Sequence, residues 1–503
     1  MTGLVASIVP TSAVTGIALT DRALRAGADM IELRLDHFRE PEQVTQVVRA
    51  AAAPVLASCR VREDGGLFTG DPDLRRRLLV AAAGAGAEWV DLEHWETLCL
   101  PAGLGTKVLR SYHKLQQAPK DLAAIVERMA RSGADALKVV AMGYDAADIA
   151  AIEELYRRHY KVPLVAFLLG EACLASRFLA VLHGAPFLYC KPGPGPGAAP
   201  GQPDLFEARE VFRARELGPE TRFWGLLGAS IAHSLGFRLH NGLGRFLAEV
   251  PVYLPFDSER PLELLETLRG FGPRFLGLSV TAPHKERVVP AMDELSAAAE
   301  ACGAVNTIVH DEGRLRGENT DVLGVRQALR VAATDDLRGK RALVIGGGGS
   351  ARAAAVALVE EGARVCIACR SRQPVREFAA RHELPLFPID ARTFDVLQPE
   401  VLVHATPVGH AARDPGECLL DMRDIVPGSI VLDLVHAPVE TELLRRARVR
   451  GAVPVSGVDV FLHQALEQIR LVLGDATAIP STESLALLLG PEARGHRRCT
   501  TPR

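Results

Sequence analysis

The chain has 503 residues, of which 48% are hydrophobic and 24% charged, and its formal net charge is −3 at pH 7. Such a composition is typical of a folded globular protein, and this length favours two to four domains over a single core. A net charge this small supplies no general field that would gather nucleic acid or acidic lipid, so it favours small-molecule partners. The sequence leaves the oligomeric state open.

The N-terminus, MTGLVASIVP, lacks the basic residues of a signal peptide. No apolar run approaches the ~18 residues of a membrane span. The nine cysteines are scattered and odd in number, which fits a reducing compartment better than a disulfide framework. We therefore expect a cytoplasmic protein without membrane contact. Cys366 and Cys369 have CxxC spacing, but no second pair is nearby, so we expect strand cysteines and no metal site.

The N-terminal part of the chain repeats a pattern in which a short β-rich run precedes a helical stretch. The runs cover 4–10, 30–36, 54–60, 89–95, 107–113, 136–142, 163–169 and 187–191. Eight strands that alternate with helices predict a (β/α)8 barrel, and the competing arrangement is an open parallel sheet. The Pro- and Gly-rich stretch 192–203 would be the loop after the eighth strand, and 204–217 the eighth helix.

Strands and helices of different spacing follow from Phe223 onward. Strand-like runs at 224–230, 250–256, 275–281 and 304–310 predict a smaller α/β domain, and the chain from Arg341 reads as strand, Gly-rich turn, helix and strand. The expected division is a barrel over 1–218, a substrate domain over 219–325 and a Rossmann-type domain over 326–455. C-terminal helices over 456–490 would return to the substrate domain, before a disordered basic tail over 491–503.

Charged residues gather at the predicted C-terminal ends of the barrel strands, where such barrels place their active sites. They are Glu32, Arg34, Asp36, Arg60, Asp64, His113 and Lys138. In the second strand the charges alternate, so they share one face, although they could instead form an ion network between the helices. Lys138 lies within an apolar strand, where an isolated ammonium is costly. A desolvated lysine beside other cations can attack a ketone as the neutral amine, and a neighbouring histidine could move protons around the iminium.

Between Leu4 and Leu217 this set of motifs resembles type I 3-dehydroquinate dehydratase. The resemblance implies that Lys138 forms the Schiff base, that His113 is the general acid and base, and that Asp64 orients His113. It also implies a set of substrate-binding residues, namely Glu32, Arg34, Arg60, Arg177 and Gln202. Two positions depart from the family, because Asp64 stands where Glu is usual and Ala198 where a Ser is frequent. We expect weaker binding or slower turnover from these changes.

The glycine-rich turn after the strand at 341–345 fits the pattern GxGxx[GA] through Gly346, Gly348 and Ala351. Between a strand and a helix this pattern predicts a pyrophosphate at the helix N-terminus, and the expected contacts are Gly346, Gly347, Gly348, Gly349, Ser350 and Ala351. The next strand ends in Arg370, Ser371 and Arg372, without the carboxylate that binds the NAD ribose. Two guanidiniums suit a 2′-phosphate, so we expect NADP, unless these arginines are only solvated surface groups.

Four motifs, at 225–234, 279–286, 303–307 and 318–321, resemble shikimate dehydrogenase, with similarity from Phe223 to Leu489. The resemblance implies that Lys285 and Asp321 are the catalytic pair. It further implies substrate contacts from Ser234, Thr281, Asn306 and Gln464. Without the family, Lys285 and Glu286 could be an exposed helix start. This half departs from the family at Gly236, which replaces a carboxylate-binding serine, and at Ser279, Val322 and His436.

Together the resemblances imply a bifunctional enzyme of the shikimate pathway of aromatic amino acid biosynthesis. It would dehydrate 3-dehydroquinate to 3-dehydroshikimate and then reduce this ketone to shikimate with NADPH. One alternative is a C-terminal half that acts on quinate or a related hydroxy-acid. The other is a regulatory sensor that has lost its chemistry, which retention of Lys138, His113, Lys285 and Asp321 argues against.

Overall fold

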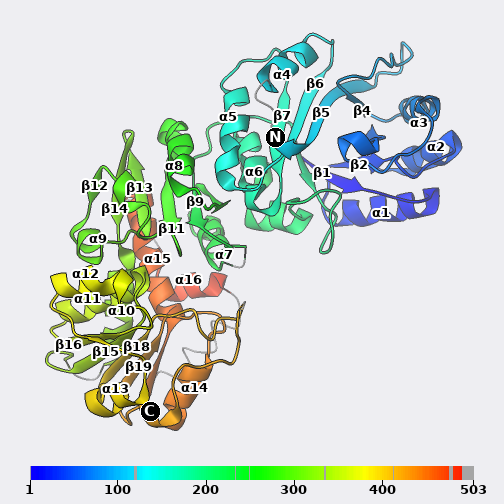
Figure 1. Cartoon of the computed structure of the whole chain (residues 1–503). Coiled ribbons are helices and arrows are strands. Elements are labelled where there is room, and N and C mark those ends of the chain that lie inside the picture. Colours follow the sequence, from blue (N-terminus) through cyan, green and yellow to red (C-terminus); the bar gives the residue numbers. More distant parts are fainter. Residues whose placement is uncertain are drawn as a thin grey trace. The chain divides into compact units, whose positions relative to one another are not determined.

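The computed structural model describes residues 2–117, 122–232, 234–247, 250–333, 336–411, 413–474 and 480–489. The chain divides into two compact units (Figure 1), one formed by Met1–Phe223 with Pro251–Arg274 and the other by Trp224–Val250 with Phe275–Arg503. The tail expected to be disordered lies outside the described residues. Within the described residues, no helix has the length and apolar character needed to span a membrane.

The N-terminal part of the first unit is a nearly closed parallel α/β barrel, which confirms the predicted fold. Its strands are β1 (Gly3–Ile8), β2 (Met30–Arg34), β3 (Val55–Ser58), β4 (Trp89–Glu93), β5 (Lys107–Gln117), β6 (Ala136–Met142), β7 (Leu164–Leu169) and β8 (Phe187–Cys190). They pair in the order β7-β6-β5-β4-β3-β2-β1-β8, so the first and last strands are neighbours. Among the described residues no ladder joins β7 to β8. Apolar side chains such as Leu56, Val140 and Phe167 are buried together in the core of the barrel.

Helices follow most of the barrel strands, and two of them begin at side-chain caps. They are α1 (Ala13–Arg25), α2 (Pro41–Ala50), α3 (Pro72–Gly84), α4 (Leu122–Ala130), α5 (Ala150–Tyr156) and α6 (Leu174–Leu182). Ser12 closes a capping box at α1, and Asp71 caps α3 ahead of Pro72 at its first turn. The eighth helix expected over 204–217 is not continuous. A π-helix (Glu207–Val211) and a 3-10 turn (Ala214–Glu216) replace it, because Arg213 adopts a left-handed backbone with φ of 51°.

The second unit contains most of the strands that follow the barrel. Strands β9 (Phe223–Gly228), β11 (Phe275–Val280), β13 (Thr307–Asp311), β14 (Arg314–Glu318) and β12 (Glu294–Leu295) adjoin in this order. Strand β10 (Val252–Asp257) falls in the segment assigned to the first unit. The strands predicted near 224, 250, 275 and 304 are thus confirmed, whereas β12 and β14 were not predicted. The remaining helices before the third sheet are α7 (Gly236–Asn241), α8 (Pro261–Arg269), α9 (Ala297–Cys302) and α10 (Thr320–Ala332).

The third sheet is a doubly wound parallel sheet of six strands in the order β17-β16-β15-β18-β19-β20. Its strands are β15 (Arg341–Ile345), β16 (Arg364–Ala368), β17 (Leu386–Phe387), β18 (Val401–His404), β19 (Ile430–Asp433) and β20 (Val453–Ser456). Counted from β15, this is the order 3-2-1-4-5-6 of a dinucleotide-binding Rossmann fold, as predicted.

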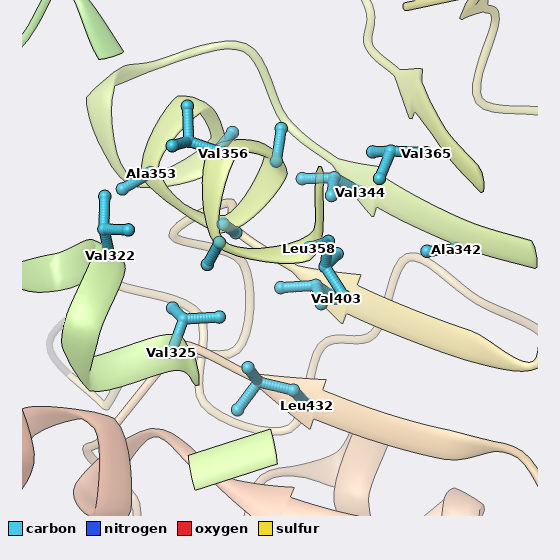
Figure 2. Packing of buried hydrophobic residues seen from close by; sticks show 14 of the residues in the cluster. Val322, Val325, Ala342, Val344, Ala353, Val356, Leu358, Val365, Val403 and Leu432 are labelled. Atoms are coloured by element: carbon cyan, nitrogen blue, oxygen red, sulfur yellow. The ribbon is translucent and has the colours of Figure 1, made fainter. Parts of the chain in front are cut away.

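Small apolar side chains allow helix α11 (Gly349–Glu360) to lie close to this sheet. Figure 2 shows Val356 and Leu358 of α11 with Val344, Val403 and Leu432 of the strands in one buried cluster. Helices α12 (Arg376–Arg381), α13 (Ala391–Leu397) and α14 (Glu442–Val449) complete the Rossmann part. Helix α15 (Gly457–Leu473) then packs along α10, and α16 (Thr482–Leu488) contacts α15 and α7.

Candidate active sites

A pocket opens at the C-terminal ends of the barrel strands. It has about 490 Å³ of free space, part of which is open to solvent. Every barrel residue to which the resemblance assigned a role lines it, namely Glu32, Arg34, Arg60, Asp64, His113, Lys138, Arg177 and Gln202. The expected residues from distant parts of the chain are therefore brought together.

Lys138 is the amine of this pocket, and its side chain is almost completely buried in β6. Its Nζ donates a hydrogen bond to Oε1 of Glu32 at 3.2 Å and lies 3.6 Å from Oδ2 of Asp91. Burial lowers the pKa of Lys138 although both carboxylates oppose that shift. Burial alone would raise the pKa of Glu32, but Lys138 and Arg34 bring it down to about 2. The ammonium of Lys138 is thus paired with two carboxylates in a buried site that lowers its pKa.

Arg34 and Asp36, the other charges of the second strand, form an ion pair of their own at 2.6 Å. Asp36 is completely buried and also accepts hydrogen bonds from the backbone N–H groups of Arg60 and Leu67. Asp36 therefore anchors the loop after β3 and orients Arg34, which lines the pocket. The alternative of an ion network between the helices does not apply to Glu32 and Arg34, because both line the pocket.

His113 ends the straight part of β5, and an arginine contacts it where a carboxylate was expected. Nη1 of Arg60 lies 2.6 Å from Nδ1 of His113. Because a guanidinium can only donate, Nδ1 accepts and the neutral ring carries its proton on Nε2. Burial, followed by the charges of Arg60 and Lys138, holds the pKa of His113 well below its usual value. The imidazole is therefore neutral at pH 7.

Asp64, expected to orient His113, lies in the short 3-10 turn Arg62–Asp64 at the pocket rim. Its carboxylate accepts a hydrogen bond from Nε1 of Trp95 at 2.9 Å. Among the described residues, Asp64 makes no hydrogen bond to His113. The structure therefore does not show the expected contact, although Asp64 belongs to the same pocket.

Arg177 is the pocket's uncompensated cation. It is buried in α6, and its Nη2 donates to the carbonyl oxygen of Pro200 at 3.1 Å, while its guanidinium carbon lies 4.3 Å from the ring centre of Phe167. No ion pair to Arg177 occurs in the described part of the chain, and burial lowers its pKa to about 10. A buried guanidinium without a carboxylate partner favours an anionic ligand. Substrate binding by Arg177 stays a prediction.

The loop after β8 places Gln202 in the pocket wall. Its Nε2 donates to Oγ of Ser7 at 3.0 Å, and its Oε1 accepts from the backbone N–H of Ala198. Ser7 in turn donates to Glu32 at 2.5 Å. Gln202 therefore links the loop to the polar floor of the pocket.

Three pocket or near-pocket residues were missed by the sequence reasoning, namely Ser7, Asp91 and Tyr189. Asp91 pairs with Arg60 at 2.7 Å and lies beside Lys138, and the ring of Tyr189 lies against Nζ of Lys138. A carboxylate within the apolar strand β4 was a signal that could have found Asp91, since a buried charge requires a partner. Ser7 and Tyr189 carry no comparable signal, because both residue types also occur in ordinary barrel cores.

A second polar cluster lies in the second unit, around Lys285. Its Nζ is 2.5 Å from Oδ2 of Asp321, in the first turn of α10, and 3.1 Å from Oγ of Ser350 in α11. Both partners of the expected pair are partly buried. The alternative reading of Lys285 as an exposed helix start is therefore wrong, because its amine faces Asp321 and the N-terminal turn of α11.

Asn306 connects this pair to the helix that follows the Rossmann sheet. Its Nδ2 donates to Oδ1 of Asp321 at 2.8 Å and to Oγ1 of Thr320, and lies 3.4 Å from Oε1 of Gln464 in α15. The expected residues Asn306 and Gln464 therefore belong to one network with Lys285 and Asp321. Ser279 donates to Gln468, which holds the backbone oxygen of Asn306. Ser279 thus has a structural hydrogen bond at the position where the family carries Asn.

Ser234 and Thr281 lie near strand ends of the second unit, but neither makes a hydrogen bond to the Lys285 network within the described residues. Oγ of Ser234 accepts from the backbone N–H of Gly236, the buried first residue of α7. His436 stacks on Phe461 with 5.5 Å between ring centres. Burial, with smaller contributions from His410 and Lys285, lowers the pKa of His436 to about 4. The imidazole of His436 is therefore neutral at pH 7.

The glycine-rich turn has the geometry of a phosphate cradle. Gly346 adopts a φ of 133°, and a Cβ there would lie 2.7 Å from the carbonyl oxygen of Ala405, so only glycine fits. A Cβ at Gly348 would meet nothing within 4 Å, which leaves open space at the start of α11. Gly349 lies against Lys285, so this helix N-terminus adjoins the pair of Lys285 and Asp321. The site fits a pyrophosphate.

Arg370, Ser371 and Arg372 follow β16 and are exposed. Neither arginine forms an ion pair within the described part of the chain, and no carboxylate ends the strand. Two free guanidiniums beside the cradle fit a nucleotide that carries an extra phosphate on its ribose.

The fold and the two clusters define a two-site enzyme, in which a lyase barrel with a buried amine precedes a dinucleotide-dependent dehydrogenase. The family profile "Type I 3-dehydroquinase" matches residues 4–219, and "Shikimate dehydrogenase substrate binding domain" matches 226–308. This chain belongs to the family of bifunctional 3-dehydroquinate dehydratase/shikimate dehydrogenases.

The family assignment rests on a full-length relative. "Bifunctional 3-dehydroquinate dehydratase/shikimate dehydrogenase, chloroplastic" from Arabidopsis thaliana is 30% identical over 483 residues, which covers 90% of this chain and 79% of that protein. "Shikimate dehydrogenase (NADP(+))" from Salinibacter ruber is 36% identical and covers 50% of this chain and 91% of that protein. The solved structure of dehydroquinate dehydratase and shikimate dehydrogenase from S. pombe AroM is 25% identical in sequence. The match covers 97% of this chain and 98% of that chain, with a TM-score of 0.43.

Proposed function

We propose that the barrel dehydrates 3-dehydroquinate to 3-dehydroshikimate and that the C-terminal half reduces this ketone to shikimate with NADPH. The observation that carries the proposal is that each half holds a reactive lysine beside the groups its reaction requires. Lys138 shares a pocket with the unpaired cation Arg177, and Lys285 adjoins the phosphate cradle. The two reactions are consecutive, because the ketone produced by the first is the substrate of the second.

The barrel pocket can perform the dehydration through an imine. Arg177 binds the substrate carboxylate, and the neutral amine of Lys138 attacks the ketone. Loss of water from the resulting carbinolamine gives an iminium, which acidifies the neighbouring C–H group. His113, neutral at pH 7, takes that proton and returns it to the β-hydroxyl as this leaves as water. Hydrolysis of the product iminium consumes one water, so the net change is the loss of one water.

For these steps His113 must accept a proton, whereas its Nδ1 already accepts a hydrogen bond from Arg60. Glu32, Arg34 and Arg60 bind the ring hydroxyls in this proposal, and Gln202 closes over the substrate. Engagement of Arg60 by a substrate hydroxyl releases Nδ1, so the imidazole becomes a base only when the pocket is filled. Asp64, close by at the rim, then orients the ring.

In the dehydrogenase half, NADPH, when bound, would supply the hydride for the carbonyl carbon. Lys285 donates a proton to the ketone oxygen, and Asp321, held by Asn306, keeps the amine oriented. Ser234, Thr281, Asn306 and Gln464 bind the substrate. Gly346 to Ala351 hold the pyrophosphate, and Arg370, Ser371 and Arg372 hold the ribose phosphate.

The domain boundaries follow the same division. We propose the barrel over 1–218, the substrate domain over 219–325, the NADP domain over 326–455 and the returning helices over 456–490. A cytoplasmic location is supported by cysteines that form no disulfide among the described residues.

The test separates the two activities in one chain. Purified protein with 3-dehydroquinate and NADPH should form shikimate, whereas Lys138→Ala should abolish only the dehydration and Lys285→Ala only the reduction. Each variant is the control for the folding of the other half. A wild-type protein that binds both compounds without turnover would instead indicate a regulatory sensor.

A further inference from the structure

Tyr189 lies against the reacting nitrogen of the barrel pocket. It comes from β8, its side chain is 3% exposed, and it lines the pocket. Nζ of Lys138 is 3.9 Å from the centre of its ring. The ring is therefore in direct contact with the nitrogen that forms the imine.

The ring shares this nitrogen with Glu32 and Asp91, whose oxygens lie 3.2 and 3.6 Å away. Carboxylates can take the proton of the ammonium, whereas an aromatic ring cannot. Burial, and then the charges of Glu32 and Asp91, raise the pKa of Tyr189 well above its usual value, so the phenol stays neutral. Tyr189 thus presents the negative face of a neutral ring, an interaction that strengthens when the cation is desolvated.

We propose that Tyr189 is a further catalytic residue of the dehydratase, which stabilises the cationic forms of the Lys138 nitrogen through its ring face. The ammonium and the iminium are attracted to this face, whereas the neutral amine and the neutral carbinolamine gain little. When the carbinolamine C–O bond breaks, hydroxide leaves with a proton as water and the nitrogen lone pair forms the C=N bond. The positive charge then develops on the nitrogen that the ring contacts. This inference rests on the proposed imine mechanism.

The ring and the hydroxyl of Tyr189 can be tested separately by substitution. It is buried and has no hydrogen-bond partner within the described residues. Its removal in Tyr189→Phe therefore breaks no contact in the free protein and keeps the ring. Tyr189→Met keeps an apolar side chain of similar length and removes the ring. Phe187 offers a matched control, because it lies two residues earlier on the same strand and packs in the same core without contacting Lys138.

The experiment measures the rate at which borohydride inactivates the dehydratase in the presence of saturating 3-dehydroquinate, because that rate follows the amount of iminium. Tyr189→Met should be inactivated about tenfold more slowly than wild type, as expected for a desolvated cation–π contact. The acid limb of kcat/KM should move to lower pH, because without the ring the ammonium loses its proton more readily. Tyr189→Phe should restore most of both properties, and Phe187→Met should keep the wild-type rate.

Folding is checked in each variant by the shikimate dehydrogenase activity and by thermal unfolding, and Tyr189→Leu replaces Tyr189→Met if the latter does not fold. Equal inactivation of wild type and Tyr189→Met would overturn the role of Tyr189 while the imine stands. A Phe variant as slow as the Met variant would also overturn it, because the ring would not be the active group. If the active wild type gives no borohydride adduct, the imine mechanism itself fails and this inference with it.

Discussion

Nη1 of Arg60 lies 2.6 Å from Nδ1 of His113, although 53 positions separate the two residues in the chain. The same guanidinium is paired with Asp91, so its position is fixed by a buried carboxylate. The hydrogen bond that Arg60 donates to Nδ1 and the lowered pKa of His113 both keep the imidazole neutral. The carboxylate of Asp64 is close by but is held by Trp95.

Lys138 should be the site of a covalent adduct. Borohydride added with 3-dehydroquinate reduces an iminium to a stable amine, and the peptide that carries Lys138 should gain the mass of the reduced substrate. Lys114, which lies on β5 just after His113, is the internal control and should remain unmodified. An adduct on another peptide, or its absence in active enzyme, would contradict the Schiff-base mechanism.

Arg60→Gln should raise the pKa of His113. After burial, the charge of Arg60 is the main cause that lowers this pKa, and Gln can still donate to Nδ1 without a charge. Titration of the His113 ring followed by NMR, with the signal assigned by comparison with His113→Gln, measures the change. Arg60→Lys keeps the charge and should keep the low pKa. The electrostatic account would be wrong if the Gln and Lys variants titrated alike.

The dehydrogenase should prefer NADP over NAD by at least ~100-fold, since two charged contacts at roughly 1.5 kcal/mol each give a factor of this size. The double variant Arg370→Ala, Arg372→Ala should lose most of this preference. Arg364→Ala, at the opposite end of β16, is the control and should retain it. The measurement is the ratio of kcat/KM for the two cofactors. Equal use of both by the wild type contradicts the assignment.

His436 should make the protein less stable in weak acid. Its pKa is about 4 in the folded protein and about 6.5 in an unfolded chain, so only the unfolded state binds the proton between these values. The free energy of unfolding should therefore fall as pH drops from 6.5 to 4, by up to about 3 kcal/mol from this residue. His436→Tyr should flatten this part of the pH dependence of the thermal midpoint. An unchanged slope would show that His436 is protonated in the folded state.

Gly236→Ser should strengthen 3-dehydroshikimate binding. The missing serine hydroxyl would donate a charge-assisted hydrogen bond to the substrate carboxylate, so its return should lower the KM about tenfold. The added side chain also takes space that could admit the extra hydroxyl of quinate, so any quinate activity should weaken. The measurement is the ratio of kcat/KM for shikimate to kcat/KM for quinate, in the wild type and in Gly236→Ser. A wild-type protein that favours quinate would overturn the substrate assigned to this half.

The sequence by itself determined the features that depend on local periodicity and local motifs. Short β-rich runs between helical stretches located the eight barrel strands within a few residues, and the glycine pattern located the turn before α11, because strand propensity and backbone freedom act over short distances. The family motifs likewise placed Lys138, His113, Lys285 and Asp321. The prediction of a continuous helix over 204–217 was wrong. The composition of this stretch favours a helix, but the left-handed backbone of Arg213 interrupts it.

Only the tertiary structure decided which groups meet. Lys138 contacts Glu32 across 106 positions, and Gln202 contacts Ser7 across 195. The tertiary structure also brings the ring of Tyr189 against Nζ of Lys138. At His113 it brings Arg60 into contact, where Asp64 was expected. Such pairings are settled by competition for buried partners, since each buried charge binds whichever opposite charge or donor the packed strands bring within reach. Residue type and spacing along the chain do not contain that information.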